Sequence, residues 1–309
     1  MMIETKDLTK KFGALTAVEG VTLSVAEGEV FGFLGPNGAG KTTTVRMLCS
    51  LISRTSGEAR IGGYDVGDDE GSLRARKMIG LVSDNVGLYE VLSAYRNLEI
   101  YGRLYGVPEA RRRENIEKLL TMLGLWEKRD VAAGTFSKGM KQKLAVARAL
   151  VHDPEVVFMD EPTANLDPES AKTVREFILE LKKERRTIFL NTHNLDEAER
   201  VCDRIAILNT RLMATGTPGE LESMVGGKKV VVELARPSEA VVAALNERYA
   251  GFTVAPGGTR LTFAPSDPDG QIPDVVEAVV RAGGRVRYAG VEGSSLESTY
   301  LQLVKGEAR

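Results

Sequence analysis

A glycine-rich turn between an apolar run and a helix constrains this chain more than any other stretch. Residues 29–48 read EVFGFLGPNGAGKTTTVRML. The apolar run Val30–Leu34 predicts a strand, and the apolar spacing of Val45, Met47 and Leu48 predicts a helix after the turn. Between them stands G-x-x-x-x-G-K-[ST]. These strand and helix flanks are the context in which that pattern forms a phosphate-binding loop.

The residue types in the turn suit phosphate groups. Gly35, Gly38 and Gly40 let the backbone turn tightly enough for successive N–H groups to converge on phosphate oxygens, and the next helix adds its positive dipole end. Lys41 would place its charge between β- and γ-phosphate, and the Thr42 hydroxyl is a hard oxygen ligand for Mg²⁺. The alternative, a glycine-rich turn with an exposed lysine, is disfavoured by the flanks. The predicted loop comprises Gly35, Pro36, Asn37, Gly38, Ala39, Gly40, Lys41, Thr42 and Thr43.

Composition narrows the class of protein. The 309 residues suffice for one large domain or two ordinary ones, and 41 basic against 43 acidic residues gives a net charge of −2, so nucleic-acid binding is not indicated. Cys49 and Cys202 lie in helix-like apolar settings, which favours a reduced, cytosolic protein over a disulfide scaffold. No run approaches 18 apolar residues and the N-terminus lacks a signal-peptide core, so we expect neither a membrane span nor export.

A second motif follows an apolar run at residues 156–159, which is typical of a strand covered on both faces of a parallel sheet. The run ends in Asp160 and Glu161, and carboxylates at the carboxyl end of a central strand point into the crevice where α/β sheets bind ligands. Asp160 would hold Mg²⁺, and Glu161 could polarise an attacking water. An acidic pair in an ordinary loop is the alternative, and the phosphate loop in the same chain favours the functional interpretation.

His193 follows a third apolar run, Thr187–Asn191. A single histidine is often structural, but this position predicts a hydrogen bond to a γ-phosphate that orients the water. Phe12 lies between two predicted strands, residues 2–9 and 19–31, that lead into the phosphate loop. Its ring could stack on adenine for roughly 1–3 kcal/mol, or it could pack the strand turn, and this residue alone leaves both open.

A second candidate anion site lies in FSKGMKQKLAVARAL, residues 136–150. Ser137 can cap a helix with Gly139 in its first turn, and such a helix start attracts anions. The chain would then contain two phosphate-binding helix ends.

Together these motifs resemble the nucleotide-binding subunit of an ABC transporter over residues 1 to about 225. GPNGAGKTT resembles its Walker A loop, FSKGM its signature, VVFMDE its Walker B strand, ANLD at 164–167 its D-loop, and His193 its switch histidine. The resemblance implies a head-to-tail homodimer that holds two ATP molecules with Mg²⁺, each between Walker A of one subunit and Ser137 and Gly139 of the other. It also implies an ATPase peripheral to the cytoplasmic face of the cell membrane that powers export through a separate transmembrane permease.

Three departures from the family pattern stand out. Lys138 and Met140 replace a glycine and a glutamine of the signature, and 164–165 read Ala-Asn where serine and glycine are usual. Asp84 stands where the family has a glutamine that contacts Mg²⁺ and water. Aspartate is a good ligand for a hard metal but adds negative charge beside the phosphates, so we expect Asp84 to report on the metal.

The predicted fold class is α/β. A P-loop ABC ATPase domain at 1–225, with a mixed sheet core and a helical signature subdomain at about 85–150, precedes a small α+β domain at 226–309. Helices are expected at Ala94–Leu104 and 110–123, where Tyr89, Tyr95, Tyr101 and Tyr105 form a core or line a groove for a permease helix. The arginines at 111–113 predict a solvated helix face, with contact to membrane phosphate groups as the alternative.

The C-terminal stretch reads strand-helix-strand-strand-helix-strand and then helix, which fits a ferredoxin-like sandwich. The second helix is expected at 273–283 and the last at 296–305. A dimerisation or regulatory role for this domain rests on analogy alone. The alternative function is a soluble ABC-type ATPase acting on nucleic acid or ribosomes, which the acidic balance and the single cassette disfavour. A regulatory module with weak hydrolysis is a third, and Glu161 and His193 argue against it.

Overall fold

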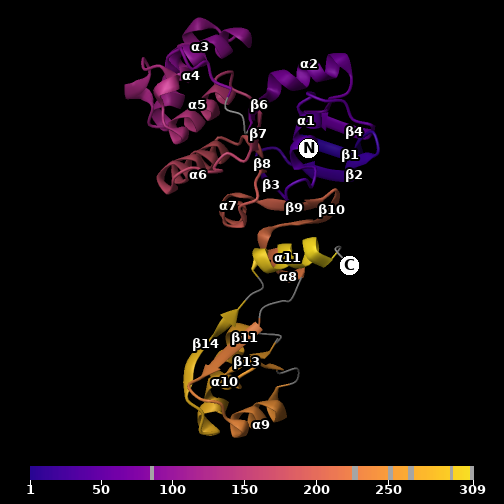
Figure 1. Ribbon diagram of the computed structural model, residues 1–309, viewed down its shortest axis with the longest axis vertical. Coiled ribbons are helices and arrows are strands. Elements are labelled where there is room, and N and C mark those ends of the chain that lie inside the picture. The colour runs from indigo at the N-terminus through magenta and orange to yellow at the C-terminus, as the bar shows by residue number, and fades with distance from the viewer. Residues whose placement is uncertain (84–86, 225–228, 250–252, 264–267, 293–294, 307–309) are drawn as a thin grey trace. The chain divides into compact units, whose positions relative to one another are not determined.

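The computed structural model describes residues 1–83, 87–224, 229–249, 253–263, 268–292 and 295–306. The chain divides into two compact units, Met1–Thr217 and Pro218–Arg309. The first unit contains two sheets and the second unit contains one (Figure 1). The domain division predicted at residues 225 and 226 lies outside the described residues and stays a prediction.

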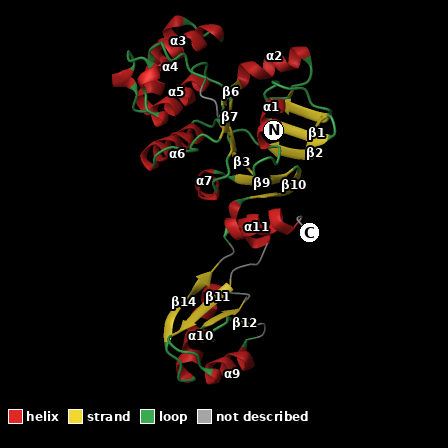
Figure 2. Ribbon diagram, in the orientation of Figure 1, coloured by secondary structure: helices red, strands yellow, loops and turns green. Residues whose placement is uncertain are grey.

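A six-stranded sheet forms the centre of the first unit, with strand order β10-β9-β3-β8-β7-β6. The pairs are parallel except β9 with β10. Strands β3, β7 and β8 are buried along their whole length because helices cover both faces: α1 packs on β7 and α6 on β8 (Figure 2). The bounds are β3 (Val30–Leu34), β6 (Ile79–Val82), β7 (Val156–Asp160), β8 (Thr187–Asn191), β9 (Arg204–Asn209), β10 (Arg211–Gly216), α1 (Lys41–Leu48), α6 (Pro168–Lys183) and α7 (Leu195–Val201).

An antiparallel sheet of order β2-β1-β4-β5 packs on the face of α1 that points away from β7. Helix α2 follows β5 in the chain. Its bounds are β1 (Ile3–Phe12), β2 (Leu15–Val25), β4 (Ser56–Ile61), β5 (Tyr64–Asp65) and α2 (Asp69–Met78). The predicted strand at 19–31 is wrong over residues 26–29, because Gly28 has φ +75° and the chain turns there. The expected connection at 10–18 is instead mostly strand, with its turn at Gly13.

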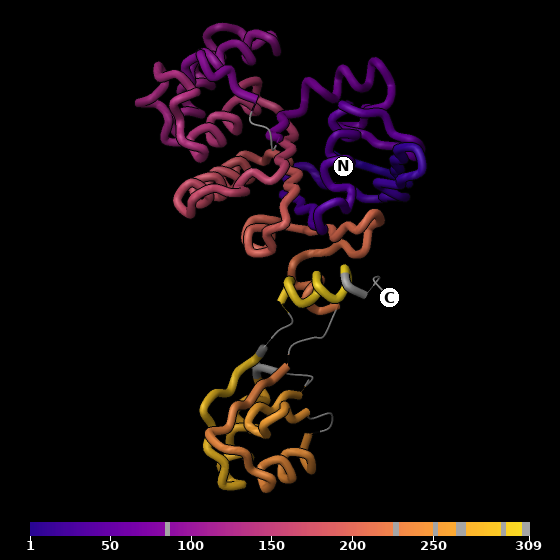
Figure 3. The backbone as a smooth tube through the Cα atoms, in the orientation of Figure 1, coloured from indigo at the N-terminus to yellow at the C-terminus, as the bar shows by residue number. Residues whose placement is uncertain are grey.

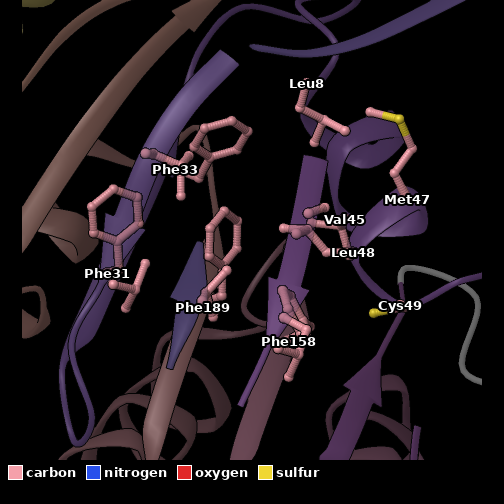
Figure 4. Close-up of a cluster of buried hydrophobic side chains, with 14 of the residues drawn as sticks. Leu8, Phe31, Phe33, Val45, Met47, Leu48, Cys49, Phe158 and Phe189 are labelled. Atoms are coloured by element: carbon pink, nitrogen blue, oxygen red, sulfur yellow. The ribbon is translucent and has the colours of Figure 1, made fainter. Parts of the chain in front are cut away.

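Aromatic rings pack across the sheet just below the ends of β3, β7 and β8. Phe189 lies at the middle of this cluster, with its ring centroid 5.1 Å from Phe33, 5.4 Å from Phe158 and 5.6 Å from Phe31 (Figure 4). All four side chains are fully buried. Such pairs stabilise by about 0.5–1.5 kcal/mol beyond the area that they bury. The strand ends that carry Asp160 and Asn191 are therefore held on a rigid support.

A helical subdomain lies between β6 and β7 in the sequence. Its backbone is at the upper left of Figure 3. It contains α3 (Ala94–Leu104), α4 (Glu109–Met122), α5 (Lys138–Leu150) and the short 3₁₀ turns η1 (Trp126–Lys128) and η2 (Ala133–Thr135). The helix predicted at Ala94–Leu104 is confirmed, and α4 starts and ends one residue before the predicted 110–123.

Exposure within this subdomain corrects two predictions. The core interpretation of the tyrosines fails for Tyr89 and Tyr105, which are 49% and 45% exposed, whereas Tyr95 and Tyr101 are half-buried. The solvated arginine face is wrong for Arg112, which is 8% exposed and donates a hydrogen bond to the Val107 carbonyl at 2.8 Å. The three arginines therefore do not share one environment.

The second unit follows the strand and helix order predicted from the sequence, around an antiparallel sheet of order β12-β13-β11-β14. Helix α10 starts five residues before the predicted 273, because Pro268 rather than Pro273 opens it. Helix α11 packs on α8. The bounds are α8 (Pro218–Met224), β11 (Lys229–Leu234), α9 (Glu239–Arg248), β12 (Thr253–Val254), β13 (Arg260–Phe263), α10 (Pro268–Arg281), β14 (Val286–Glu292) and α11 (Leu296–Gly306).

Candidate functional site

The loop between β3 and α1 requires glycine at three positions, for different reasons. Gly40 has φ +98°, and a Cβ there would lie 2.3 Å from the Ala17 carbonyl oxygen. Gly35 has no left-handed conformation, but a Cβ there would lie 2.2 Å from the Leu208 carbonyl oxygen. Gly38 has φ +84°, with no described atom within 4 Å of an added Cβ. Conformation thus fixes Gly38, close packing fixes Gly35, and both fix Gly40.

Lys41 lies folded over this loop at the start of α1. The side chain is 7% exposed, and its Nζ donates hydrogen bonds to the carbonyl oxygens of Gly35 at 2.7 Å and Pro36 at 3.1 Å. Burial lowers the pKa of Lys41, whereas the nearby Glu161 and Asp160 carboxylates raise it. A buried ammonium at the N-terminus of a helix makes this loop a strong site for an anion.

Asp160 connects the end of β7 to both neighbouring elements of the site. Its Oδ2 accepts a hydrogen bond from the Thr42 hydroxyl at 3.0 Å, and its Oδ1 accepts one from the Asn191 side-chain amide. Asp160 is 4% exposed. The Asn191 Oδ1 is buried and finds no hydrogen-bond partner among the described residues. Thr42 and Asp160 thus bring together two hard oxygen ligands beside the loop, which suits Mg²⁺ held jointly with phosphate oxygens.

Glu161 and His193 form a pair directly after β7 and β8. The His193 Nδ1 lies 2.7 Å from the Glu161 Oε2. Glu161 has φ +52°, and its backbone N–H donates to the Asn191 carbonyl oxygen at 2.8 Å. Such a conformation in a residue other than glycine costs about 1–3 kcal/mol and persists only where its surroundings impose it. The strained turn aims the carboxylate toward the next strand end.

Lys41, Thr42, Asp160 and Glu161 line one cavity of about 350 Å³, and His193 contacts Glu161 without lining it. The cavity is lined by Phe12, Leu15, Ala17, Asn37, Gly38, Ala39, Gly40, Lys41, Thr42, Thr43, Asp160, Glu161 and Asn191. Two carboxylates and a buried ammonium in one cavity suit a triphosphate that arrives with a divalent cation, because the cation offsets the carboxylate charge.

Phe12 lies at the edge of this cavity and is 49% exposed, with the Lys10 Nζ 4.9 Å from its ring centroid. Leu15 is its direct partner across the β1–β2 turn and is 66% exposed. A ring that only packed the turn would be more buried, so the geometry favours the stacking interpretation. The sequence analysis missed Leu15, although cross-strand partners share a face.

Ser137 and Gly139 lie at the start of α5. The Ser137 Oγ accepts a hydrogen bond from the Met140 N–H at 3.3 Å, which makes it the predicted cap. A Cβ on Gly139 would lie 2.2 Å from the Ser170 Oγ of α6, so that position also has no room for a side chain. Within the described part of one chain, neither residue lines the cavity that holds Lys41. The structure therefore brings together the remaining predicted residues but not these two, and Asp84 lies outside the described residues.

Comparison with known proteins supplies the family. The family model described as ABC transporter matches residues 18–164. The chain is similar to the daunorubicin/doxorubicin resistance ATP-binding protein DrrA of Streptomyces peucetius, at 36% identity over 97% of this chain and 92% of the relative. It is also similar to the linearmycin resistance ATP-binding protein LnrL of Bacillus subtilis. The identity is 34% over 80% of this chain and 77% of the relative.

Solved structures agree. A structure titled as the ATP-binding subunit of an ABC transporter matches with 32% identity and a TM-score of 0.67, covering 72% of this chain and 93% of that one. The ATP-binding cassette MJ0796, solved as a dimer with ADP and Pi, matches with 27% identity and a TM-score of 0.63. The match covers 70% of this chain and 98% of that one. The chain therefore belongs to the ABC transporter family, as one of its ATP-binding, ATP-hydrolysing proteins.

Proposed function

We propose that this ATPase powers the export of a substrate through a separate transmembrane permease, and that the residues around Lys41 carry the chemistry. The observation that supports this most is that the buried Lys41, the Thr42–Asp160 pair and Glu161 line one cavity, with His193 in contact with Glu161. The relatives DrrA and LnrL are named as resistance ATP-binding proteins, which favours export.

In this proposal the loop holds the triphosphate. Lys41 and the backbone N–H groups of residues 38–43 bind its oxygens, Thr42 and Asp160 hold Mg²⁺, and Phe12 stacks on the adenine. When bound there, Mg²⁺ would supply positive charge that offsets the charge developing on the phosphate oxygens. We also propose that Asp84, which lies outside the described residues, contributes to the use of Mg²⁺. If Asp84→Ala leaves the Mg²⁺ dependence of the ATPase rate unchanged, this role is wrong.

Glu161 would orient the attacking water and accept its proton. Because the His193 Nδ1 is engaged with the Glu161 carboxylate, Nε2 is the ring nitrogen left to face the γ-phosphate. The pair therefore connects the base to the group that is attacked. A misplacement of this base by about 1 Å can cost roughly a hundredfold in rate, which gives the strained turn at Glu161 its value.

A second copy would complete the site. Ser137 and Gly139 lie at a helix N-terminus that suits an anion, yet they do not line the cavity within the described part of their own chain. A head-to-tail homodimer places the signature of one copy over the phosphate loop of the other. Loss of this arrangement would leave the triphosphate bound on one side only.

The membrane partner would bind through residues near 84–105. Tyr89, Val91, Leu104 and Tyr105 are large apolar or aromatic side chains there that are exposed to 45–88%. None of the described helices is long and apolar enough to cross a membrane. We propose that this protein lies at the cytoplasmic face of the cell membrane, in contact with a permease subunit.

A pull-down tests the export proposal. The tagged protein is recovered from detergent-solubilised membranes of its host, with and without ATP, and Val91→Asp is the matched surface variant. We expect a polytopic membrane protein to co-purify with the unmodified chain and less of it with Val91→Asp. Recovery of ribosomal or nucleic-acid partners without any membrane protein would contradict export and leave the ATPase chemistry intact.

A further inference from the structure

A buried carboxylate lies directly behind the Glu161–His193 pair and has no role in the site described above. Glu197 is in the first turn of α7 and is 1% exposed. Its Oε2 accepts a hydrogen bond from the Thr192 hydroxyl at 2.9 Å. Its Oε1 is buried and finds no hydrogen-bond partner among the described residues.

Glu197 is part of a hydrogen-bond network around the turn that carries His193. The Thr192 hydroxyl donates to Glu197 and accepts a hydrogen bond from the Asn194 backbone N–H at 3.1 Å. The Asn194 side chain in turn accepts from the Glu197 backbone N–H at 3.1 Å. Thr192 is thus bonded directly to the Glu197 carboxylate and Asn194 reaches it through the Thr192 hydroxyl, while His193 itself is exposed and contacts Glu161.

The same carboxylate reaches the loop after Glu161. The Thr163 side chain lies close enough to lower the pKa of Glu197, as Thr192 and Arg175 also do, although burial outweighs them and raises it. Thr163 belongs to the turn that leaves Glu161, in which the Ala164 N–H donates to the Glu161 carbonyl oxygen at 3.1 Å. Glu197 therefore lies between the two loops whose side chains meet in the Glu161–His193 contact.

Packing alone does not call for a carboxylate at this position. A buried carboxylate that uses one of its two oxygens is less favourable than an apolar side chain of similar volume, because an unsatisfied buried acceptor loses its hydration without compensation. An apolar residue would lose the contacts with the Thr192 hydroxyl and the Thr163 side chain. The hydrogen bond to Thr192 is the one that fixes the turn next to His193.

We propose that Glu197 is a positioning residue for ATP hydrolysis: it fixes the turn at Thr192 so that His193 holds the Glu161 carboxylate in place. This inference rests on the roles proposed above for Glu161 and His193. Glu197 itself touches neither nucleotide nor water. Its effect should therefore fall on kcat and not on the KM for ATP.

The test compares three variants of the full chain. Glu197→Ala should lower kcat by about ten- to a hundredfold with the KM for ATP within twofold. Glu197→Gln should restore most of kcat, because its amide oxygen can still accept from the Thr192 hydroxyl. Glu199→Ala makes the same change on the exposed face of the same helix and should leave kcat unchanged. A kcat for Glu197→Ala equal to that of Glu199→Ala would overturn the inference.

A double-mutant cycle separates positioning from general destabilisation. Thr192→Val removes the hydroxyl, and the double variant with Glu197→Ala should lose no more kcat than the larger of the two single losses. If the double variant instead loses kcat by the product of the two single losses, the inference is overturned. A normal kcat for Thr192→Val would also overturn it, and this result can be obtained even if Glu197→Ala fails to fold. Glu161→Gln is measured in parallel: normal turnover there would refute the proposed site, whereas its loss with normal Glu197→Ala would refute only this inference.

Discussion

Replacing Gly40 by alanine separates the strain of a left-handed backbone from the close packing under the phosphate loop. Gly40 has φ +98° and ψ 4°, and an L-residue in a left-handed conformation costs about 1–2 kcal/mol. The added Cβ would also lie 2.3 Å from the Ala17 carbonyl oxygen, and relieving such overpacking costs about 1–3 kcal/mol. The sum predicts a loss of roughly 2–5 kcal/mol in the free energy of unfolding.

Gly63 is the matched control. It has φ +82° in the turn between β4 and β5, and no described atom lies within 4 Å of an added Cβ. Gly63→Ala should therefore cost only the backbone term of about 1–2 kcal/mol. Urea unfolding measures both stabilities, and calorimetry measures the affinity for ATP. We expect Gly40→Ala to bind ATP at least tenfold more weakly and Gly63→Ala to bind it normally. Equal stability and equal affinity of the two variants would refute the reasoning.

Three further outcomes are expected. Lys41→Ala should weaken nucleotide binding and abolish hydrolysis, because it removes the buried cation of the loop, and near-normal turnover in a phosphate-release assay would contradict the assignment. Arg112→Ala should lower the free energy of unfolding by about 1–3 kcal/mol, since Arg112 is buried and bonded to a carbonyl, whereas the exposed Arg113→Ala should change it by less than about 0.5 kcal/mol; equal values would show that burial does not matter. Burial lowers the pKa of His152, stacked 3.7 Å from Tyr105, to about 4, so the unfolded chain binds a proton first as pH falls. This difference contributes up to about 3 kcal/mol to the free energy of unfolding above pH 6.5, and the contribution is lost as the pH falls toward 4. In urea unfolding at different pH values, His152→Gln should flatten the fall in stability between these limits. An unchanged pH profile would contradict this role of His152.

The phosphate loop could be predicted from the sequence because its chemistry is local. A short loop, its glycines and the flanking strand and helix together determine where Lys41 and Thr42 lie. The carboxylates at 160 and 161 could be predicted for the same reason, since strand ends of a parallel sheet meet at one edge. The position of His193 at the same sheet edge could be predicted in this way, whereas its contact with Glu161 is seen only in the structure.

Residues whose role depends on neighbouring elements escaped the sequence analysis. Asn191 was taken as the last residue of a strand, yet its amide donates to Asp160 across the sheet. Arg112 was grouped with its neighbours in a charged run, but helix α4 turns it inward, where its side chain approaches Gly102 of α3. Glu197 resembles any acidic residue near a helix start, and only packing shows that it is buried. Such contacts join residues that are far apart in the chain, or involve residues whose burial the sequence pattern does not indicate.

The most direct test of the shared site is whether the Glu161→Gln variant is a monomer or a dimer in the presence of ATP and Mg²⁺. This variant should bind ATP but not hydrolyse it, so light scattering at high protein concentration should show a dimer with two ATP molecules. Adding Lys41→Ala to the same chain should return it to a monomer. A monomer for Glu161→Gln at saturating ATP would contradict the account, because the signature at Ser137 would then close no partner's site.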